Sequence, residues 1–149
     1  MANSTAICTS FKVDLFNGIH AFGTTVTRGG TTADSFKAAL YQTSASIGAG
    51  TTAYSATSEV SSTGYTAGGL AVTNATAPTS SGTTAYWTPS ANLAWTGVTF
   101  TTDCMLLYNS TQSNKAVASY TFSAQTVTAG NFTLTMPTNA VGTALLQIA

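Results

Sequence analysis

Charged residues are scarce in this sequence of 149 residues, which holds four basic and four acidic side chains and has a net charge of zero. They make up 5% of the chain, against roughly 25% in ordinary soluble domains. Without a basic patch the chain cannot neutralise nucleic-acid phosphates, so we expect no nucleic-acid partner. A neutral surface also does little to repel other copies. This favours a homo-oligomer of two or three copies; the alternative is a monomer kept in solution by hydroxyl groups alone.

Residues that could carry catalysis or bind a metal are also few. The sequence has one histidine, His20, and two widely spaced cysteines, Cys8 and Cys104. No nucleophile motif lies beside His20, and no two carboxylates have a spacing that forces them together. One histidine and two distant cysteines are a poor ligand set for a transition metal. We therefore expect no enzyme activity, no metal and no cofactor, and we expect both thiols to be free and buried.

Long apolar runs are absent as well. None reaches the roughly 18 residues of a membrane span, so we expect no membrane partner. The first residues lack the charged and apolar regions of a signal peptide, which predicts synthesis and folding in the cytoplasm. The four Asn-x-Ser/Thr sequons are then expected to be unused.

What the sequence does contain is alternation, which is densest over residues 93–137. Val98 and Phe100, for example, alternate with Thr99 and Thr101. A period of two with threonine, valine and aromatic residues is typical of strands that bury one face and expose the other.

Turn signals divide this alternation into short strands. The polar residues 109–114 predict the tip of a hairpin, and residues 129–131, Ala-Gly-Asn, predict a turn. The fold class that follows is mainly β, an antiparallel β-sandwich or jelly roll. The predicted strands are residues 34–42, 70–74, 86–87, 93–101, 103–109, 115–122, 131–136 and 143–148.

The N-terminal region has a different pattern. We expect a polar arm over residues 1–9, followed by a single β-rich domain over residues 10–149 that opens with a short amphipathic helix at about residues 10–22. Ser10 is a suitable cap for this helix, and Gly23 is a suitable stop. The helix would either cover its own domain or dock on a neighbouring subunit. Its apolar stripe consists of Phe11, Leu15, Phe16, Ile19 and Phe22.

A glycine-rich segment follows Glu59. It lacks the GxxxxGK[ST] pattern of a phosphate-binding loop, which leaves a structural interpretation. Gly64, Gly68 and Gly69 are expected to supply positive φ angles or close backbone approach in a turn and bulge before a strand. Glu59 itself is expected to pair with a basic side chain or to cap a turn.

Trp87 and Trp95 are the two tryptophans. They offer a platform on which a sugar could stack, but packing in the core or at a subunit interface is favoured. Together with the helix stripe, they are our candidates for anchoring a subunit contact.

Several elements, in order along nearly the whole chain, resemble a group of small virion proteins of tailed bacteriophages. The most specific of them is Gly-Tyr-Thr-Ala-Gly-Gly at residues 64–69. The elements are Ser10-Phe-Lys with Gly18-Ile-His, Phe36-Lys-Ala-Ala-Leu-Tyr41, Thr51-Thr-Ala-Tyr54, Glu59-Val with the glycine element, Leu106-Leu-Tyr-Asn109 with Lys115-Ala-Val-Ala118, and Phe132-Thr-Leu-Thr-Met-Pro137.

This resemblance implies a non-enzymatic structural component of the virion, made in the cytoplasm of the host bacterium. It implies a cement or decoration protein that binds the outside of the capsid lattice and stabilises it, with the major capsid protein as partner. The alternatives are a tail, neck or fibre-base component of the virion, or a carbohydrate-binding module that uses Trp87 and Trp95.

Overall fold

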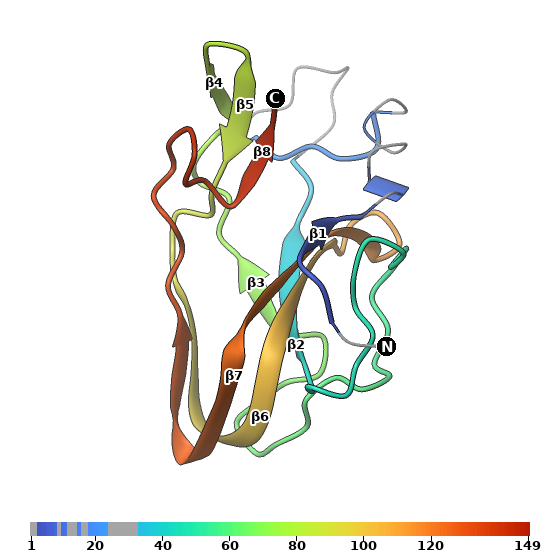
Figure 1. The fold of residues 1–149 in the computed structure, drawn as a ribbon, viewed down its shortest axis with the longest axis vertical. Helices are drawn as coiled ribbons and strands as arrows, with labels where there is room; N and C mark the ends of the chain where they lie inside the picture. The colour runs from blue at the N-terminus through green and yellow to red at the C-terminus, as the bar shows by residue number, and fades with distance from the viewer. Residues whose placement is uncertain (1–2, 9, 12–14, 16–17, 24–32) are drawn as a thin grey trace.

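The computed structural model describes residues 3–8, 10–11, 15, 18–23 and 33–149. The elements bounded within this part of the chain are all β-strands (Figure 1), and Ser10, Phe11 and Leu15 have helical backbone. They are β1 (Ala6–Ile7), β2 (Phe36–Tyr41), β3 (Leu70–Val72), β4 (Thr79–Ser81), β5 (Thr84–Trp87), β6 (Leu93–Asn109), β7 (Lys115–Leu134) and β8 (Leu146–Ile148).

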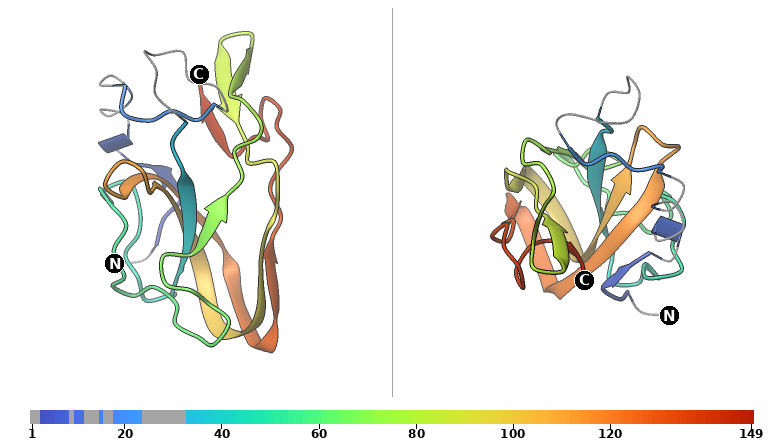
Figure 2. Two further views of the ribbon diagram at one scale, coloured as in Figure 1. Left: turned by 180° about the vertical axis from the view of Figure 1, so that it is seen from behind. Right: turned by 90° about the horizontal axis from the view of Figure 1, so that it is seen from above.

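The strands form two antiparallel sheets. One has five strands in the order β1-β7-β6-β2-β3, and the other has three in the order β4-β5-β8. Seen from behind, β2 and β3 lie next to each other, and the β4–β5 hairpin stands at the end of the molecule opposite the bend of β6 and β7 (Figure 2). The mainly β, antiparallel prediction is therefore confirmed, and the finer sandwich or jelly-roll architecture remains a prediction.

The hairpin of β6 and β7 dominates the fold and is bent back on itself (Figure 1). The rings of Phe122 and Phe132, both on β7, lie 6.1 Å apart. In a straight strand ten residues would span about 33 Å. The bend divides the hairpin into two segments. The inner arm consists of residues 104–109 and 115–121, and the outer arm consists of residues 93–102 and 125–134.

The sequence-based division of this hairpin was wrong at two places. Residues 93–101 and 103–109 form one strand, and residues 115–122 and 131–134 form another, which ends before the predicted limit at Met136. The predicted turn at residues 129–131 lies inside β7, where Phe100 pairs with Val127 and Val98 pairs with Gly130. Three steps on β7 therefore oppose two on β6, and the extra residue is taken up as a bulge. Ala129 accommodates it with a φ of 45°.

The two arms differ in burial. Residues 93–102 alternate between buried and exposed with one irregularity at Gly97, whereas residues 104–109 are buried on both faces. Loops pack over the inner arm: the Tyr54 ring stacks on Tyr108 at 4.8 Å, and the Tyr108 hydroxyl donates to the Gly68 carbonyl at 2.8 Å. The outer arm keeps one face in water, as the alternation of threonine with apolar residues predicts.

The N-terminal residues 3–8 lie along the edge of β7. Ala6 pairs with Ser119, Ile7 pairs with Ala118, and the Cys8 amide donates to the Val117 carbonyl at 3.0 Å. The Asn3 side chain adds a bond of 2.7 Å to Asp103 Oδ1. The described part of the predicted polar arm is therefore an edge strand of the large sheet.

The predicted helix falls partly on residues 12–14 and 16–17, which lie outside the described residues. The described residues 18–23 are not helical, so the helix does not extend to Phe22. Gly18 has a φ of 62° and donates its amide to the Leu15 carbonyl at 3.1 Å. A left-handed glycine at this place ends a helical turn, which is why the predicted end at Gly23 was wrong.

Candidate functional site

The six predicted anchor residues that the structure describes do not form a surface patch. Phe11, Phe22, Trp87 and Trp95 are 0%, 9%, 2% and 2% exposed. Ile19 is half-buried, and Phe16 lies outside the described residues. Leu15, at 37%, is the exposed member of the described set.

Trp87 belongs to an aromatic cluster between the two sheets. The Phe22 ring stacks on Phe36 at 4.4 Å and meets Trp87 edge-on at 5.0 Å. Trp87 Nε1 donates to the Thr76 carbonyl at 2.8 Å, so its polar atom is satisfied inside the protein. An apolar cavity of about 160 Å³ borders this cluster and is lined by Phe11, Leu15, Phe22, Pro78, Ala85, Tyr86, Trp87, Leu146 and Ile148.

Trp95 belongs to a second cluster, inside the bend of the hairpin. Its ring lies 5.8 Å from Phe132 and 6.3 Å from Tyr65. Phe100 packs edge-on against Phe132 at 5.6 Å. Because both tryptophans are buried in such clusters, neither offers a face on which a sugar could stack, and the structure gives no support to the carbohydrate-binding alternative.

Glu59 is the centre of a buried polar cluster. It is 6% exposed, and its carboxylate accepts three hydrogen bonds. Tyr54 donates to Oε2 at 2.7 Å, while Tyr65 and the Gly68 amide donate to Oε1 at 2.7 and 2.8 Å. Among the described residues no basic side chain forms an ion pair with it, so donated hydrogen bonds compensate its burial.

Other tyrosines extend this cluster. The Tyr108 hydroxyl donates to the Gly68 carbonyl at 2.8 Å, and the Tyr41 hydroxyl donates to the Ser55 carbonyl at 2.7 Å. Burial raises the pKa of Tyr108 to about 12, with a further contribution from the charge of Glu59. These hydroxyls therefore remain protonated donors at neutral pH. The sequence analysis missed these partners, although a lone acid flanked by tyrosines at residues 54 and 65 was a signal.

The three glycines after Glu59 have positive φ angles of 81°, 88° and 71° at Gly64, Gly68 and Gly69. A Cβ atom at Gly69 would collide with the Ala38 backbone, and one at Gly64 would collide with the Thr96 carbonyl. Close approach and left-handed backbone are both required here. The segment is thus pressed against β2 on one side and the outer arm on the other.

Asp34 is the centre of a second buried cluster, 4% exposed. Its Oδ2 accepts from the Ala21 amide at 2.9 Å and from Asn109 Nδ2 at 2.8 Å, and its Oδ1 accepts from Gln112 Nε2 at 3.1 Å. Asn109 Nδ2 also lies 3.0 Å from His20 Nδ1. Asn109 thus stands between the histidine and the carboxylate.

The orientation of the Asn109 amide fixes the role of Nδ1 of His20. Its Oδ1 accepts from the Thr111 and Gln112 amides at 3.1 Å each, so its Nδ2 must face His20. Nδ1 of His20 is then the acceptor of this hydrogen bond. This cluster ties the hairpin tip to His20, Ala21 and Asp34.

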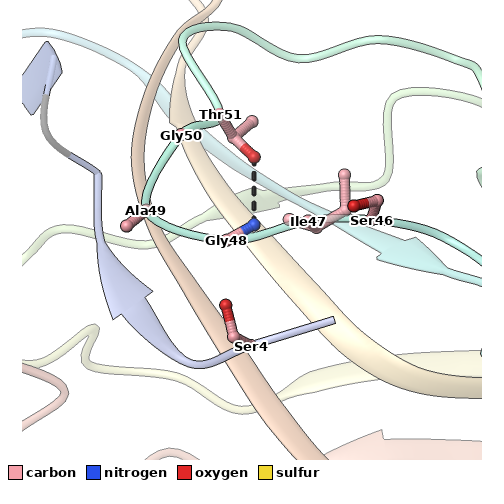
Figure 3. A pocket seen from close by; sticks show the side chains of 7 residues that line it. All are labelled: Ser4, Ser46, Ile47, Gly48, Ala49, Gly50 and Thr51. Carbon is pink, nitrogen blue, oxygen red and sulfur yellow. Dashed lines mark hydrogen bonds between the residues drawn. The ribbon is translucent and has the colours of Figure 1, made fainter. Parts of the chain in front are cut away.

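A cavity of about 400 Å³ lies where residues 46–51 meet the N-terminal strand (Figure 3). Gly48 donates its amide to Thr51 Oγ1 at 3.1 Å, and Ser4 donates its amide to the Ile47 carbonyl at 2.8 Å. The lining residues carry hydroxyls and small side chains but no ionisable group. The cavity can therefore offer hydrogen bonds and no acid–base chemistry.

Two further kinds of site, reactive thiols and groups of side chains that could bind a metal ion, are absent from the described part of the chain. Cys8 and Cys104 are free and buried, and burial raises their pKa values to about 11 and about 12. No three His, Cys, Asp or Glu residues in that part gather into a metal site. Nor does that part include a helix with the length and hydrophobicity that a bilayer crossing requires.

Comparison of the chain with protein-family models, with curated proteins and with solved structures finds no match.

Proposed function

We propose that this protein is a non-enzymatic structural component of a bacteriophage virion, a cement or decoration protein that binds the outside of the capsid lattice and stabilises it. The proposal starts from the sequence resemblance, whose most specific element is Gly-Tyr-Thr-Ala-Gly-Gly at residues 64–69. The partner is the major capsid protein of the same particle.

The observation that carries the proposal is that residues 64–69 are bound into the framework of the fold by hydrogen bonds and close packing. Tyr65 and Gly68 bind the buried Glu59, and Gly64 and Gly69 are packed against neighbouring backbone. Every distinctive residue of the element therefore has a role in holding the framework together. An element with such roles supports a structural protein more than a catalytic one.

The surface chemistry also supports a lattice-binding role. A cement protein binds the assembled shell and not the separated subunits, so it favours assembly by mass action. Threonine-rich strand faces can donate and accept hydrogen bonds without long-range charge. We further propose a sandwich-like arrangement in which the outer arm of the bent β6–β7 hairpin forms a second layer over the part of the large sheet that contains the inner arm, β1, β2 and β3.

A tail, neck or fibre-base component remains the rival within the virion. The two proposals differ in what the protein binds, so reconstitution separates them. Particles assembled without the chain are mixed with the purified protein, and its binding and their resistance to heat are measured. We expect saturable binding at many sites and a higher temperature of genome release. Binding confined to a few sites at one vertex, with no gain in heat resistance, would refute the cement role.

A further inference from the structure

The apolar cavity of about 160 Å³ beside Trp87 lies where the three-stranded sheet meets the segment before β2. One face of the sheet supplies part of its lining. Ala85 pairs with Ile148 and Trp87 pairs with Leu146, so these four side chains lie together on that face. The residues that line the cavity from the N-terminal segment are Phe11, Leu15 and Phe22.

This cavity has a closed end and an open end. Trp87 and Leu146 are buried, whereas Ala85 is exposed and Ile148 is 45% exposed. In the described part of the chain three large hydrophobic side chains are exposed, and two of them, Leu15 and Ile148, line this cavity. Apolar surface that gathers around a hollow, instead of being scattered singly, is typical of a binding site.

Contacts within the protein hold the closed end in place. The Phe22 ring meets Trp87 edge-on at 5.0 Å, and Phe11 meets Phe22 edge-on at 5.9 Å. Trp87 Nε1 donates to the Thr76 carbonyl at 2.8 Å, so the indole needs no polar partner from a ligand. These walls are ordered in the free protein, and binding against them therefore costs little side-chain entropy.

We propose that this cavity binds a small uncharged molecule with a single aromatic ring. A cavity of about 150 Å³ with aliphatic and aromatic walls takes up benzene, so the volume here suits one ring. The lining residues, all in the described part of the chain, carry no charge at neutral pH. A charged ligand would therefore lose its hydration without compensation. An aromatic ring also makes edge-to-face contacts with the walls that a saturated chain does not make.

The test uses benzene as the probe and the two tryptophans as reporters in the same molecule. Trp87 lines the cavity, whereas Trp95 belongs to the cluster inside the bend of the hairpin. The full chain is titrated with benzene, and the indole N–H resonances of both residues are followed by NMR spectroscopy. We expect the Trp87 resonance to shift saturably, with a Kd on the order of 1 mM, and the Trp95 resonance to stay in place. Benzoate should move neither resonance.

A matched pair of variants locates the site. Ala85→Leu places a larger side chain at the open end of the cavity, and Ala94→Leu places the same side chain at an exposed position of β6. Circular dichroism verifies that each variant is folded. We expect Ala94→Leu to bind benzene as the wild type does, and Ala85→Leu to bind it at least tenfold more weakly. The inference concerns the free protein and does not rest on the virion role.

Three results would overturn the proposal. The first is a Trp87 resonance in the wild type that moves no more than that of Trp95 up to the solubility limit of benzene. The second is a folded Ala85→Leu variant that binds benzene as tightly as Ala94→Leu does, because the ring would then lie elsewhere. The third is benzoate binding as tight as that of benzene, which would contradict the exclusion of charge.

Discussion

At the residue scale, the cost of burying the Glu59 carboxylate is compensated by uncharged hydrogen-bond donors. Two tyrosine hydroxyls and one backbone amide point at its oxygens. Tyr65 has a double role, since its hydroxyl also accepts from the Leu40 amide at 3.0 Å. The cluster therefore joins residues 54–68 to the central strand β2 through one side chain.

Tyr65→Phe tests this link. The substitution keeps the ring but leaves a buried carboxylate oxygen and a backbone amide each short of one partner. We expect the free energy of unfolding to fall by about 2 kcal/mol. Tyr86→Phe is the matched control, because among the described residues the Tyr86 hydroxyl has no hydrogen-bond partner. Equal denaturation midpoints for the two variants would show that the cluster does not stabilise the fold.

Gly69→Ala tests the close approach to β2. The new Cβ would collide with the Ala38 backbone, and φ is +71°. Gly82→Ala is the control, because its φ is +58° but no atom lies near its Cβ position. We expect about 1 kcal/mol of destabilisation for Gly82→Ala from the left-handed backbone alone. For Gly69→Ala we expect at least about 3 kcal/mol or failure to fold. Similar urea midpoints would contradict the packing described.

The buried tyrosines predict a loss of stability at alkaline pH. Burial raises the pKa of Tyr108 to about 12 and also raises the pKa values of Tyr41, Tyr65 and Tyr120. Unfolded tyrosines ionise at about pH 10, so above that pH the unfolded state binds fewer protons than the native state.

The contribution to stability is thus complete below about pH 10 and is lost as the pH rises towards about 12. Tyrosinate absorbance and circular dichroism, followed together against pH, measure this. We expect most tyrosines to ionise only as the strand signal disappears. Ionisation at pH 10 of all tyrosines in a folded protein would contradict their burial.

At the scale of elements, the bent hairpin depends on the aromatic cluster inside its bend. Phe132 is 8% exposed and contacts Trp95, Phe100 and Phe122. We expect Phe132→Ala to lower the free energy of unfolding by about 3–5 kcal/mol because it leaves a cavity. Thr133→Ala, one residue further on the exposed face, should change it by less than about 0.5 kcal/mol. A small effect of both would mean that the arms do not pack together.

The sequence pattern located most strand residues of this hairpin correctly, but it did not show that the short predicted strands join into two long ones. The alternation around Val98 and Phe100 identified the buried face of the outer arm. It could not show that residues 129–131 form a bulge, because turns and bulges use the same residues. Which of them forms depends on pairing with β6, some thirty residues away in the chain.

The hydrogen-bond and packing partners within the buried clusters could not be predicted from local sequence patterns for the same reason. Glu59 was expected to pair with a basic side chain or to cap a turn, and its observed partners are two tyrosine hydroxyls and the Gly68 amide. Trp87 and Trp95 were candidates for a contact because tryptophan is common at interfaces. Only the tertiary fold decides which face of an aromatic residue is covered, and here both rings are inside.

At the scale of the whole molecule, the few charges are unevenly spread along the chain: all eight charged residues fall within residues 12–59 and 103–115. Such a molecule has little electrostatic repulsion between copies. Its buried carboxylates, Asp34 and Glu59, are compensated by hydrogen bonds inside the protein. Both features suit a protein that is used at high local concentration on a repeating surface, as the cement role requires.

The most direct test of the proposed role is the copy number of the chain in purified particles of the bacteriophage to which the proposal assigns it. Quantitative mass spectrometry gives the ratio of this chain to the major capsid protein. A protein that covers the lattice should be present at about one-third to one copy per capsid subunit, as the symmetry of the lattice requires. A ratio nearer about one-hundredth, the value for a component at a single vertex, would contradict the account and assign the protein to the tail or neck.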